Sequence, residues 1–237
     1  MVYAFSSGQN SAVVMAVLQI YDQLLQFPLF QGMSRDDLEI VAGHTRFGFS
    51  KLSSGKKIVV DGEPCTQLYF LINGSVTVET FAEDHRFSVV ERMSAPFILQ
   101  QEAIFGYHQC YTHTYTSLTK VNMLTIDKEE VLRLLEEFLI FRLNMVNLFA
   151  TQTQKLFRRA WQRSPQSLRE RACRFFLEHS TYPAGHKTFY ILMGQLAEEL
   201  NDSRLNVSRL LKELEQEELV ESHRGRVEIP QLERLIM

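Results

Sequence analysis

The chain has 237 residues, of which 45% are hydrophobic, and its formal net charge at pH 7 is −3. A chain of this length has room for two domains of ordinary size, each with its own apolar core. Three widely spaced cysteines, Cys65, Cys110 and Cys173, exclude a disulfide framework and a paired-cysteine metal site, and they indicate a reducing compartment. The apolar stretch at residues 12–20 is too short to span a bilayer, so we expect a soluble, cytoplasmic protein without membrane partners.

The charges are distributed unevenly along the chain. Residues 1–150 carry 11 basic and 16 acidic side chains, and the remainder carries 14 and 12, so the two parts have net charges of −5 and +2. Nucleic acid repels acidic surfaces, and the balance therefore favours the C-terminal part as the one that faces a nucleic acid.

Two helices are predicted before residue 45. Apolar residues at helical spacing predict the first over residues 11–26, and Pro28 marks its end. Ser34, with Asp37 three residues later, predicts the start of the second. We expect both helices to pack at the edge of the next domain, and we assign them no function.

From about residue 45 to 126 the pattern changes to short apolar runs separated by turns that contain glycine. The turn dipeptides are Ser54-Gly55, Asp61-Gly62 and Asn73-Gly74. The predicted strands lie at residues 58–60, 68–72, 76–79, 87–90 and within 112–125. Many short strands at this spacing predict a β-barrel or sandwich.

Residues 127–162 return to helical spacing, and Asp127 with Glu130 predicts a capping pair at the start. From residue 139 the apolar residues follow the four-three spacing of a coiled-coil seam, which predicts a helix that joins two copies of the chain. A core helix of a monomer is the alternative. The seam residues are Leu139, Leu143, Val146, Ala150, Thr153 and Phe157. A neighbouring stripe widens the apolar surface enough for this helix to contact both its own β domain and a partner chain, and it consists of Phe138, Met145, Phe149 and Leu156.

A hinge is predicted where the long helix ends. Ser164 as a cap and Pro165 at the first helical position predict the start of the next helix. The arginines around this hinge are interpreted mainly as solvated surface, with contacts to phosphate or to the acidic sensor domain as the alternatives.

The stretch 192–214 predicts two short amphipathic helices around a tight turn at residues 201–202, with Ala197 where the helices approach closely. Ser203 can cap the second helix. That helix carries polar groups on the face away from its apolar side, as a helix in the major groove needs, because Arg can bind guanine with two hydrogen bonds. An ordinary helical hairpin with a solvated face is the alternative.

Residues 223–226 form a predicted turn between two short strands, which indicates a wing with a basic tip that contacts phosphate. A solvated turn is the alternative. The predicted DNA-binding residues of helix and wing are Ser203, Arg204, Asn206, Ser208, Arg209, Arg224 and Arg226.

The motifs Gln195-Leu196-Ala197, Ser203-Arg204 and residues 207–214 resemble, without gaps, the C-terminal domain of the CRP/FNR family of bacterial transcription regulators. The resemblance implies that Arg204 and Arg209 face DNA. Leu205 stands where many members carry a glutamate that accepts from a base, so the family's usual half-site is not expected.

Residues 61–78, DGEPCTQLYFLINGSVTV, resemble the early strands of the family's cyclic-nucleotide-binding fold. The fold class implied is α+β, in three parts. Residues 1–126 form N-terminal helices and a double-stranded β-helix sensor domain of jelly-roll type, 127–163 form the dimerisation helix and hinge, and 164–237 form the winged helix-turn-helix domain.

The effector pocket departs from that of the cyclic-AMP-binding members. These members bind the phosphate with a Gly-Glu pair at the start of a short helix and with an Arg-Ser pair later in the chain. This chain has Gln100-Gln101 and Tyr111-Thr112 at the aligned positions. Glu102 could replace the missing carboxylate only if the alignment were shifted by one residue. A buried phosphate without a cationic partner is costly, so we do not expect cyclic AMP in the family's mode. The effector, if one binds these five residues, stays unknown.

Histidine and cysteine side chains near the pocket raise the alternative of a haem or metal-dependent gas or redox sensor. His108, Cys110 and His113, with His85 nearby, are competent ligand types, but their spacing places them on different faces. We interpret them as loop polar groups and a buried thiol, and predict neither a metal site nor a cysteine-ligated iron–sulfur centre.

The sequence thus predicts a homodimeric transcription regulator that binds near-palindromic double-stranded DNA, with half-sites roughly 34 Å apart. A small-molecule effector and RNA polymerase are further candidate partners. The alternative is an effector-binding module whose winged helix contacts proteins. The motifs of common hydrolases and dinucleotide-dependent enzymes are absent from the sequence, and we do not expect an enzyme.

Overall fold

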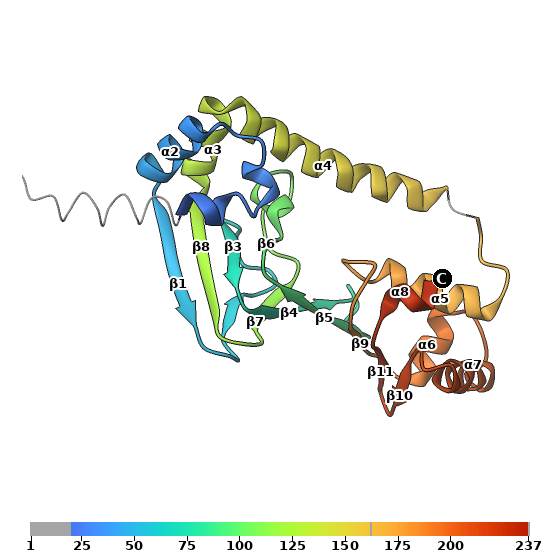
Figure 1. The fold of residues 1–237 in the computed structure, drawn as a ribbon. Coiled ribbons are helices and arrows are strands. Elements are labelled where there is room, and N and C mark those ends of the chain that lie inside the picture. Colours follow the sequence, from blue (N-terminus) through green and yellow to red (C-terminus); the bar gives the residue numbers. More distant parts are fainter. Residues whose placement is uncertain (1–19, 162, 237) are drawn as a thin grey trace, which may run out of the picture.

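The computed structural model describes residues 20–161 and 163–236, which form two lobes connected by a long helix (Figure 1). The N-terminal lobe begins with a helical turn at residues 20–24, and the rest of the helix predicted over 11–26 lies outside the described residues. A 3₁₀ turn, η1 (Pro28–Phe30), and helix α2 (Arg35–His44) follow. The predicted cap of α2 is confirmed, because the Asp37 amide donates to Ser34 Oγ at 3.1 Å.

Two antiparallel sheets make the β-sandwich of this sensor lobe. One has the order β1-β8-β3-β6, and the other contains β5-β4-β7-β2. Their bounds are β1 Phe47–Leu52, β2 Lys57–Val59, β3 Gln67–Asn73, β4 Ser75–Phe81, β5 Ser88–Ser94, β6 Phe97–Leu99, β7 Thr114–Ser117 and β8 Val121–Asp127. The turn at Gly74 requires glycine: its φ is +93°, and an added Cβ would lie 2.4 Å from the Lys120 carbonyl oxygen.

Helices α3 (Lys128–Glu137) and α4 (Leu139–Ala160) close the sensor lobe, whose core is formed by apolar side chains of both sheets and these helices. Phe30 and Phe141 pack with ring centroids 5.2 Å apart. The predicted Asp127–Glu130 capping pair is wrong. Asp127 occupies the cap position without a side-chain hydrogen bond, and Glu130 accepts from Arg133 instead, because this charge-assisted contact lies within reach on the helix surface.

Helix α4 presents two different faces. Phe141 and Met145 are buried in the sensor core, whereas the seam residues are exposed, with Val146 at 56% and Phe157 at 68%. Leu156 of the neighbouring stripe is also exposed, because the outer part of α4 extends beyond the sandwich (Figure 1). Among the described residues, no helix is long and apolar enough to cross a membrane.

The C-terminal lobe consists of helices and a small sheet around its own core. Its elements are α5 Leu168–Glu178, β9 Lys187–Tyr190, α6 Met193–Glu199, α7 Arg204–Gln216, β10 Glu221–His223, β11 Arg226–Ile229 and α8 Leu232–Ile236. The predicted start of α5 at Ser164-Pro165 is wrong. Ser167 caps this helix by accepting from the Glu170 amide at 3.1 Å, and Ser164 and Pro165 lie in the non-helical hinge before it.

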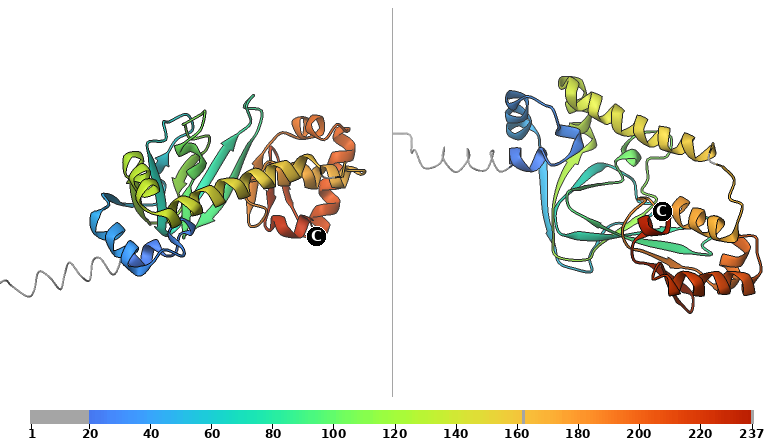
Figure 2. Two further views of the ribbon diagram at one scale, coloured as in Figure 1. Left: turned by 90° about the horizontal axis from the view of Figure 1, so that it is seen from above. Right: turned by 45° about the vertical axis from the view of Figure 1, so that its right-hand side comes forward.

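The second sheet does not end within the sensor lobe. Strand β5 pairs with β9 of the C-terminal lobe, so that one seven-stranded sheet runs in the order β10-β11-β9-β5-β4-β7-β2. Figures 1 and 2 show the two strands side by side where the lobes meet. The sequence analysis assigned no strand to residues 187–190 and therefore missed this connection.

Candidate nucleic-acid interface

The helix pair α6 and α7 forms a compact helix-turn-helix. Ala197 is buried where the helices approach, and its carbonyl accepts from the Asp202 amide at 2.9 Å, which closes the turn. Asn201 has a φ of +47°, a conformation that asparagine tolerates better than most residues. Ser203 accepts from the Asn206 amide at 3.2 Å, and this confirms the predicted cap at the start of α7.

A polar network that the sequence analysis missed braces this turn. Arg171 of α5 donates to the Leu200 carbonyl at 2.9 Å and to Asp202 Oδ2 at 2.5 Å. Asp202 Oδ1 accepts from the Ser203 amide and from Asn206 Nδ2, both at 2.8 Å. The first turn of α7 is thus held by a carboxylate, which is favourable at a helix N-terminus. Asn206, predicted as a DNA-binding residue, is hydrogen-bonded to this network through its side-chain amide nitrogen.

Low pH is expected to weaken this polar network around Asp202. The hydrogen bond from Asn206, with those from the Ser203 amide and Arg171, holds the pKa of Asp202 below its usual range. A lowered folded-state pKa contributes stability above the unfolded value, about 3.9, and that contribution is lost as the pH falls through the folded-state pKa. We therefore expect Asp202→Asn to flatten the pH dependence of the unfolding free energy below about pH 4. Urea titrations of the wild type and of Asp202→Asn at several pH values measure the unfolding free energy. The same dependence of this free energy on pH in the two proteins would contradict the prediction.

The face of α7 directed away from the core is exposed and basic. Arg204, Asn206 and Arg209 are exposed and Ser208 is half-buried. Leu205, at 60% exposure, places an apolar side chain on the same first turn. These side chains project from the N-terminal half of the helix, the part that contacts base edges when a helix of this kind enters the major groove.

The predicted wing is present beside α7. Strands β10 and β11 pair with His223 opposite Arg226, and Gly225 makes the turn with a φ of +75°. Arg224 is exposed at the tip, whereas Arg226 is half-buried and forms a salt bridge with Glu228 at 2.9 Å. A groove of about 480 Å³ between wing and helices is lined by, among others, Leu192, Gln195, Arg204, His223 and Arg224.

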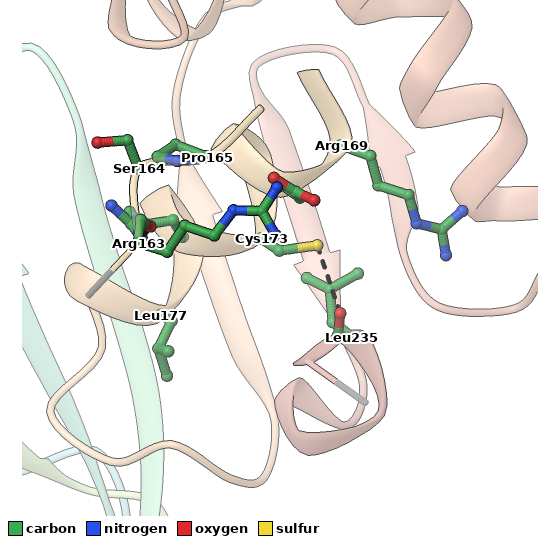
Figure 3. A pocket seen from close by; sticks show the side chains of 9 residues that line it. Arg163, Ser164, Pro165, Arg169, Cys173, Leu177 and Leu235 are labelled. Atoms are coloured by element: carbon green, nitrogen blue, oxygen red, sulfur yellow. Dashed lines mark hydrogen bonds between the residues drawn. The ribbon is translucent and has the colours of Figure 1, made fainter. Parts of the chain in front are cut away.

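The arginines near the hinge hold the C-terminal lobe together. Arg169 binds Glu217 of the segment after α7 with two hydrogen bonds of 2.6 and 2.5 Å, and Arg174 donates to the Arg163 carbonyl. A pocket of about 400 Å³ lies between the hinge, α5 and α8 (Figure 3). The Cys173 thiol donates to the Leu235 carbonyl there, and burial raises its pKa, which disfavours the reactive thiolate.

In the sensor lobe, two of the predicted effector-pocket residues, Gln100 and Thr112, are hydrogen-bonded to each other. Gln100 has a left-handed backbone, with φ +37°, immediately before the 3₁₀ turn η2 (Gln101–Ile104). The side-chain nitrogen of Gln100 donates to Thr112 Oγ1 at 2.7 Å, and its side-chain oxygen accepts from the backbone N–H of Thr112 at 3.0 Å. Residues 97–117 contain no lysine or arginine. Two residues that align with the family's phosphate-binding positions thus form a reciprocal hydrogen-bonded pair of neutral groups, and this segment supplies no cation for a phosphate.

Of the other predicted pocket residues, Gln101 and Glu102 lie in η2, with Glu102 exposed, while Tyr111 points elsewhere. The Tyr111 hydroxyl donates to the Gln67 carbonyl at 3.0 Å, and burial raises its pKa. Tyr115, which the sequence analysis missed, is buried beside this segment. Burial raises its pKa well above the ordinary range, although a hydrogen bond to the Gln100 backbone opposes the shift.

The histidines and cysteines do not converge. His113 Nδ1 lies 2.8 Å from Thr80 Oγ1, and burial lowers the pKa of the imidazole. Cys110 lies in a backbone bridge with Pro64, and His85 packs on Phe81. Within residues 20–161 and 163–236, no group of three or more His, Cys, Asp or Glu side chains is arranged to hold a metal ion.

Two family models match the chain in succession. Residues 49–138 match the cyclic nucleotide-binding domain, and residues 170–237 match the Crp-like helix-turn-helix domain. No curated protein gives a significant match.

Solved structures share the fold at low sequence identity. The catabolite activator protein of Thermus thermophilus is 20% identical, with a TM-score of 0.52 over 89% of this chain and 97% of that one. A transcriptional regulator of the CRP/FNR family from Eubacterium rectale is 19% identical, with a TM-score of 0.51 over 89% and 97%. The sensor domain of the regulator DNR from Pseudomonas aeruginosa is 18% identical, with a TM-score of 0.51 over 64% and 97%.

A β-sandwich that matches the cyclic nucleotide-binding domain thus precedes a winged helix-turn-helix that matches the Crp-like domain, and the two lie on one chain in the order found in these regulators. The chain belongs to the CRP/FNR family of transcription regulators.

Proposed function

We propose that the protein is a homodimeric regulator that binds a near-palindromic DNA site through α7 and responds to an effector in its sensor lobe. The observation that carries the DNA part is the capped helix α7 with Arg204 and Arg209 exposed on one face, next to a wing whose tip presents Arg224. The arginines of α7 would read base edges, and Arg224 would contact phosphate. Arg226, which is paired with Glu228, would position the wing.

The dimer proposal is supported by the seam of α4. Its apolar residues are exposed along one side of the helix although the opposite side is buried in the sensor core. Two such helices packed at the four-three spacing would bury the stripe. The two-fold axis would then set two recognition helices at half-sites one helical turn apart.

The effector proposal is limited by the chemistry of the pocket segment. The hydrogen-bonded pair of Gln100 and Thr112, and the absence of basic residues from 97–117, support a regulator that does not bind cyclic AMP in the family's usual mode. The site favours an effector without a buried phosphate.

Selection of genomic DNA fragments by the purified protein, at one stated salt concentration, tests the proposed function. We expect a two-fold symmetric motif, and we expect the double variant Arg204→Ala, Arg209→Ala to lose it, because each bidentate base contact contributes about 1–3 kcal/mol of discrimination. Arg234→Ala, an exposed arginine of α8, is the matched control and should retain the motif. A motif that the double variant binds as well as the wild type does would contradict the assignment of α7.

A further inference from the structure

The two lobes are connected by strand pairing as well as by the hinge. Strand β5 would be an unpaired edge of the sensor sheet, and β9 an unpaired edge of the wing sheet, if the lobes were apart. In the structure they pair antiparallel over four residues, from Ser88 opposite Tyr190 to Glu91 opposite Lys187. The pairing satisfies two exposed edges at once, and such edges otherwise invite pairing with other chains.

A buried ion pair lies at the end of this ladder. Lys187 Nζ donates to Glu91 Oε1 at 2.7 Å, and the two side chains are 0% and 1% exposed. The Glu91 carboxylate also accepts from the amides of Thr181 and Tyr182, at 2.9 and 3.3 Å. These donors come from the C-terminal lobe and the acceptor from the sensor. Separation of the lobes would return both charges to water, whereas removal of one partner leaves a buried charge without compensation.

Apolar packing continues across the same boundary. Phe87 and Val89 of the sensor belong to the core of the C-terminal lobe, and the Phe87 ring lies 5.5 Å from Phe175. Tyr182 of the C-terminal lobe packs edge-on against Phe97, with centroids 5.8 Å apart, and desolvation raises the pKa of Tyr182 to about 12. Phe97 in turn packs on Tyr115, beside the predicted pocket segment. The contact thus connects the effector segment to the DNA-binding lobe.

The tip of the β4–β5 hairpin reaches the helix-turn-helix itself. Arg86 binds Glu198 of α6, and Asp84 lies 3.9 Å from the same guanidinium. Docking therefore places the carboxylate of Asp84 near the first helix of the motif. That helix crosses the DNA backbone in complexes of this kind, where additional negative charge is unfavourable.

The hinge does not fix the orientation of the lobes by itself. Its described residues 163–167 are non-helical and mostly exposed, so α4 does not continue into α5. The relative position of recognition helix and sensor is therefore set by the contacts of β5, Glu91 and Tyr182.

We propose that these contacts form a latch that holds the DNA-binding lobe in an autoinhibited arrangement and must open before the two recognition helices of a dimer engage the operator. The latch comprises the β5–β9 ladder, the Glu91–Lys187 pair and the contact of Tyr182 with Phe97. The inference rests on the proposed function. An effector that enters beside Phe97 and Tyr115 displaces Tyr182, and it thereby binds the open arrangement better than the closed one, which is the condition for a ligand to shift the equilibrium.

A disulfide across the ladder tests the latch. Val90 and Thr188 stand opposite each other, and facing residues of an antiparallel pair have Cα atoms about 4.5–5.5 Å apart, within the span of a disulfide. The full-length double variant Val90→Cys, Thr188→Cys is titrated with operator DNA before and after reduction by dithiothreitol. The operator is the one selected by the wild type or by a Glu91→Ala variant. We expect the oxidised form to bind about tenfold more weakly than the reduced form, or weaker still.

The controls separate the latch from other effects. Wild-type protein under the same treatment accounts for the native cysteines. Hydrogen exchange at residues 187–190 should be slow in the wild type and in Glu79→Ala, a half-buried carboxylate of β4, and fast in Glu91→Ala. Equal operator affinity of the oxidised and reduced forms, or fast exchange in the wild type, would overturn the latch. Absence of specific binding in all reduced proteins, Glu91→Ala included, would instead overturn the proposed function and the latch with it.

Discussion

Val146→Glu is expected to convert the dimer into monomers and to lower operator affinity by roughly 10³-fold, the lower end of the usual ratio between specific and non-specific binding. Val146 lies in the middle of the α4 seam and is 56% exposed in the single chain. Two glutamates would face each other across the two-fold axis, where an apolar pair would otherwise be buried. The fold of each chain should survive, because the side chain does not contribute to the sensor core.

Sedimentation equilibrium and an operator titration at constant salt measure both parts of this prediction. Thr151→Glu is the matched control, since Thr151 is exposed on α4 but outside the seam. The control should stay dimeric and should bind as the wild type does. A Val146→Glu protein that remains a dimer with unchanged affinity would show that the chains associate through another surface.

Lys187→Ala is expected to lower the free energy of unfolding of the docked protein by about 3–5 kcal/mol, the usual cost of leaving one member of a buried ion pair alone. Glu91 would then keep its two amide donors but lose the cation. Opening the β5–β9 ladder would return this carboxylate to water, so the loss of stability should be accompanied by faster hydrogen exchange at residues 187–190.

A paired replacement separates the charge from the packing. Glu91→Gln with Lys187→Met removes both charges but retains an oxygen that accepts from the Thr181 amide, and we expect it to recover most of the loss. Urea unfolding followed by circular dichroism measures the series, with Glu79→Gln on β4 as the control. If Lys187→Ala were as stable as the wild type, the buried pair would not hold the lobes together.

The candidate site was predictable where its signals are local. The cap at Ser203, the close approach at Ala197, the turn of the wing and the seam of α4 all depend on residues within about one or two helical turns of each other, so spacing alone indicates them. Local signals can also compete. Ser164 and Ser167 are both good caps, and Ser167 is selected because its partner Glu170 completes the first turn of α5.

Three features depended on the tertiary structure. The polar network of the helix-turn-helix joins Arg171 to Asp202, and a neutral hydrogen-bonded pair in the predicted pocket segment joins Gln100 to Thr112. The buried ion pair across the lobes joins Glu91 to Lys187, 96 residues apart. Each couples polar groups whose separation in sequence follows no period.

By itself, the sequence determined the fold class, the order of the two domains and the face of α7 that is free for DNA. The alternation of strand and helix patterns and the exposed face of α7 follow from hydrophobic periodicity and from side chains that cap or break local structure, and the resemblance to the CRP/FNR family implied the fold class and the domain order. Only the tertiary structure decided where the DNA-binding lobe docks. The sequence of an edge strand does not indicate which strand it pairs with, because the backbone hydrogen bonds of a sheet do not depend on the side chains. Burial of Glu91 is favourable only when Lys187, distant in sequence, pairs with it.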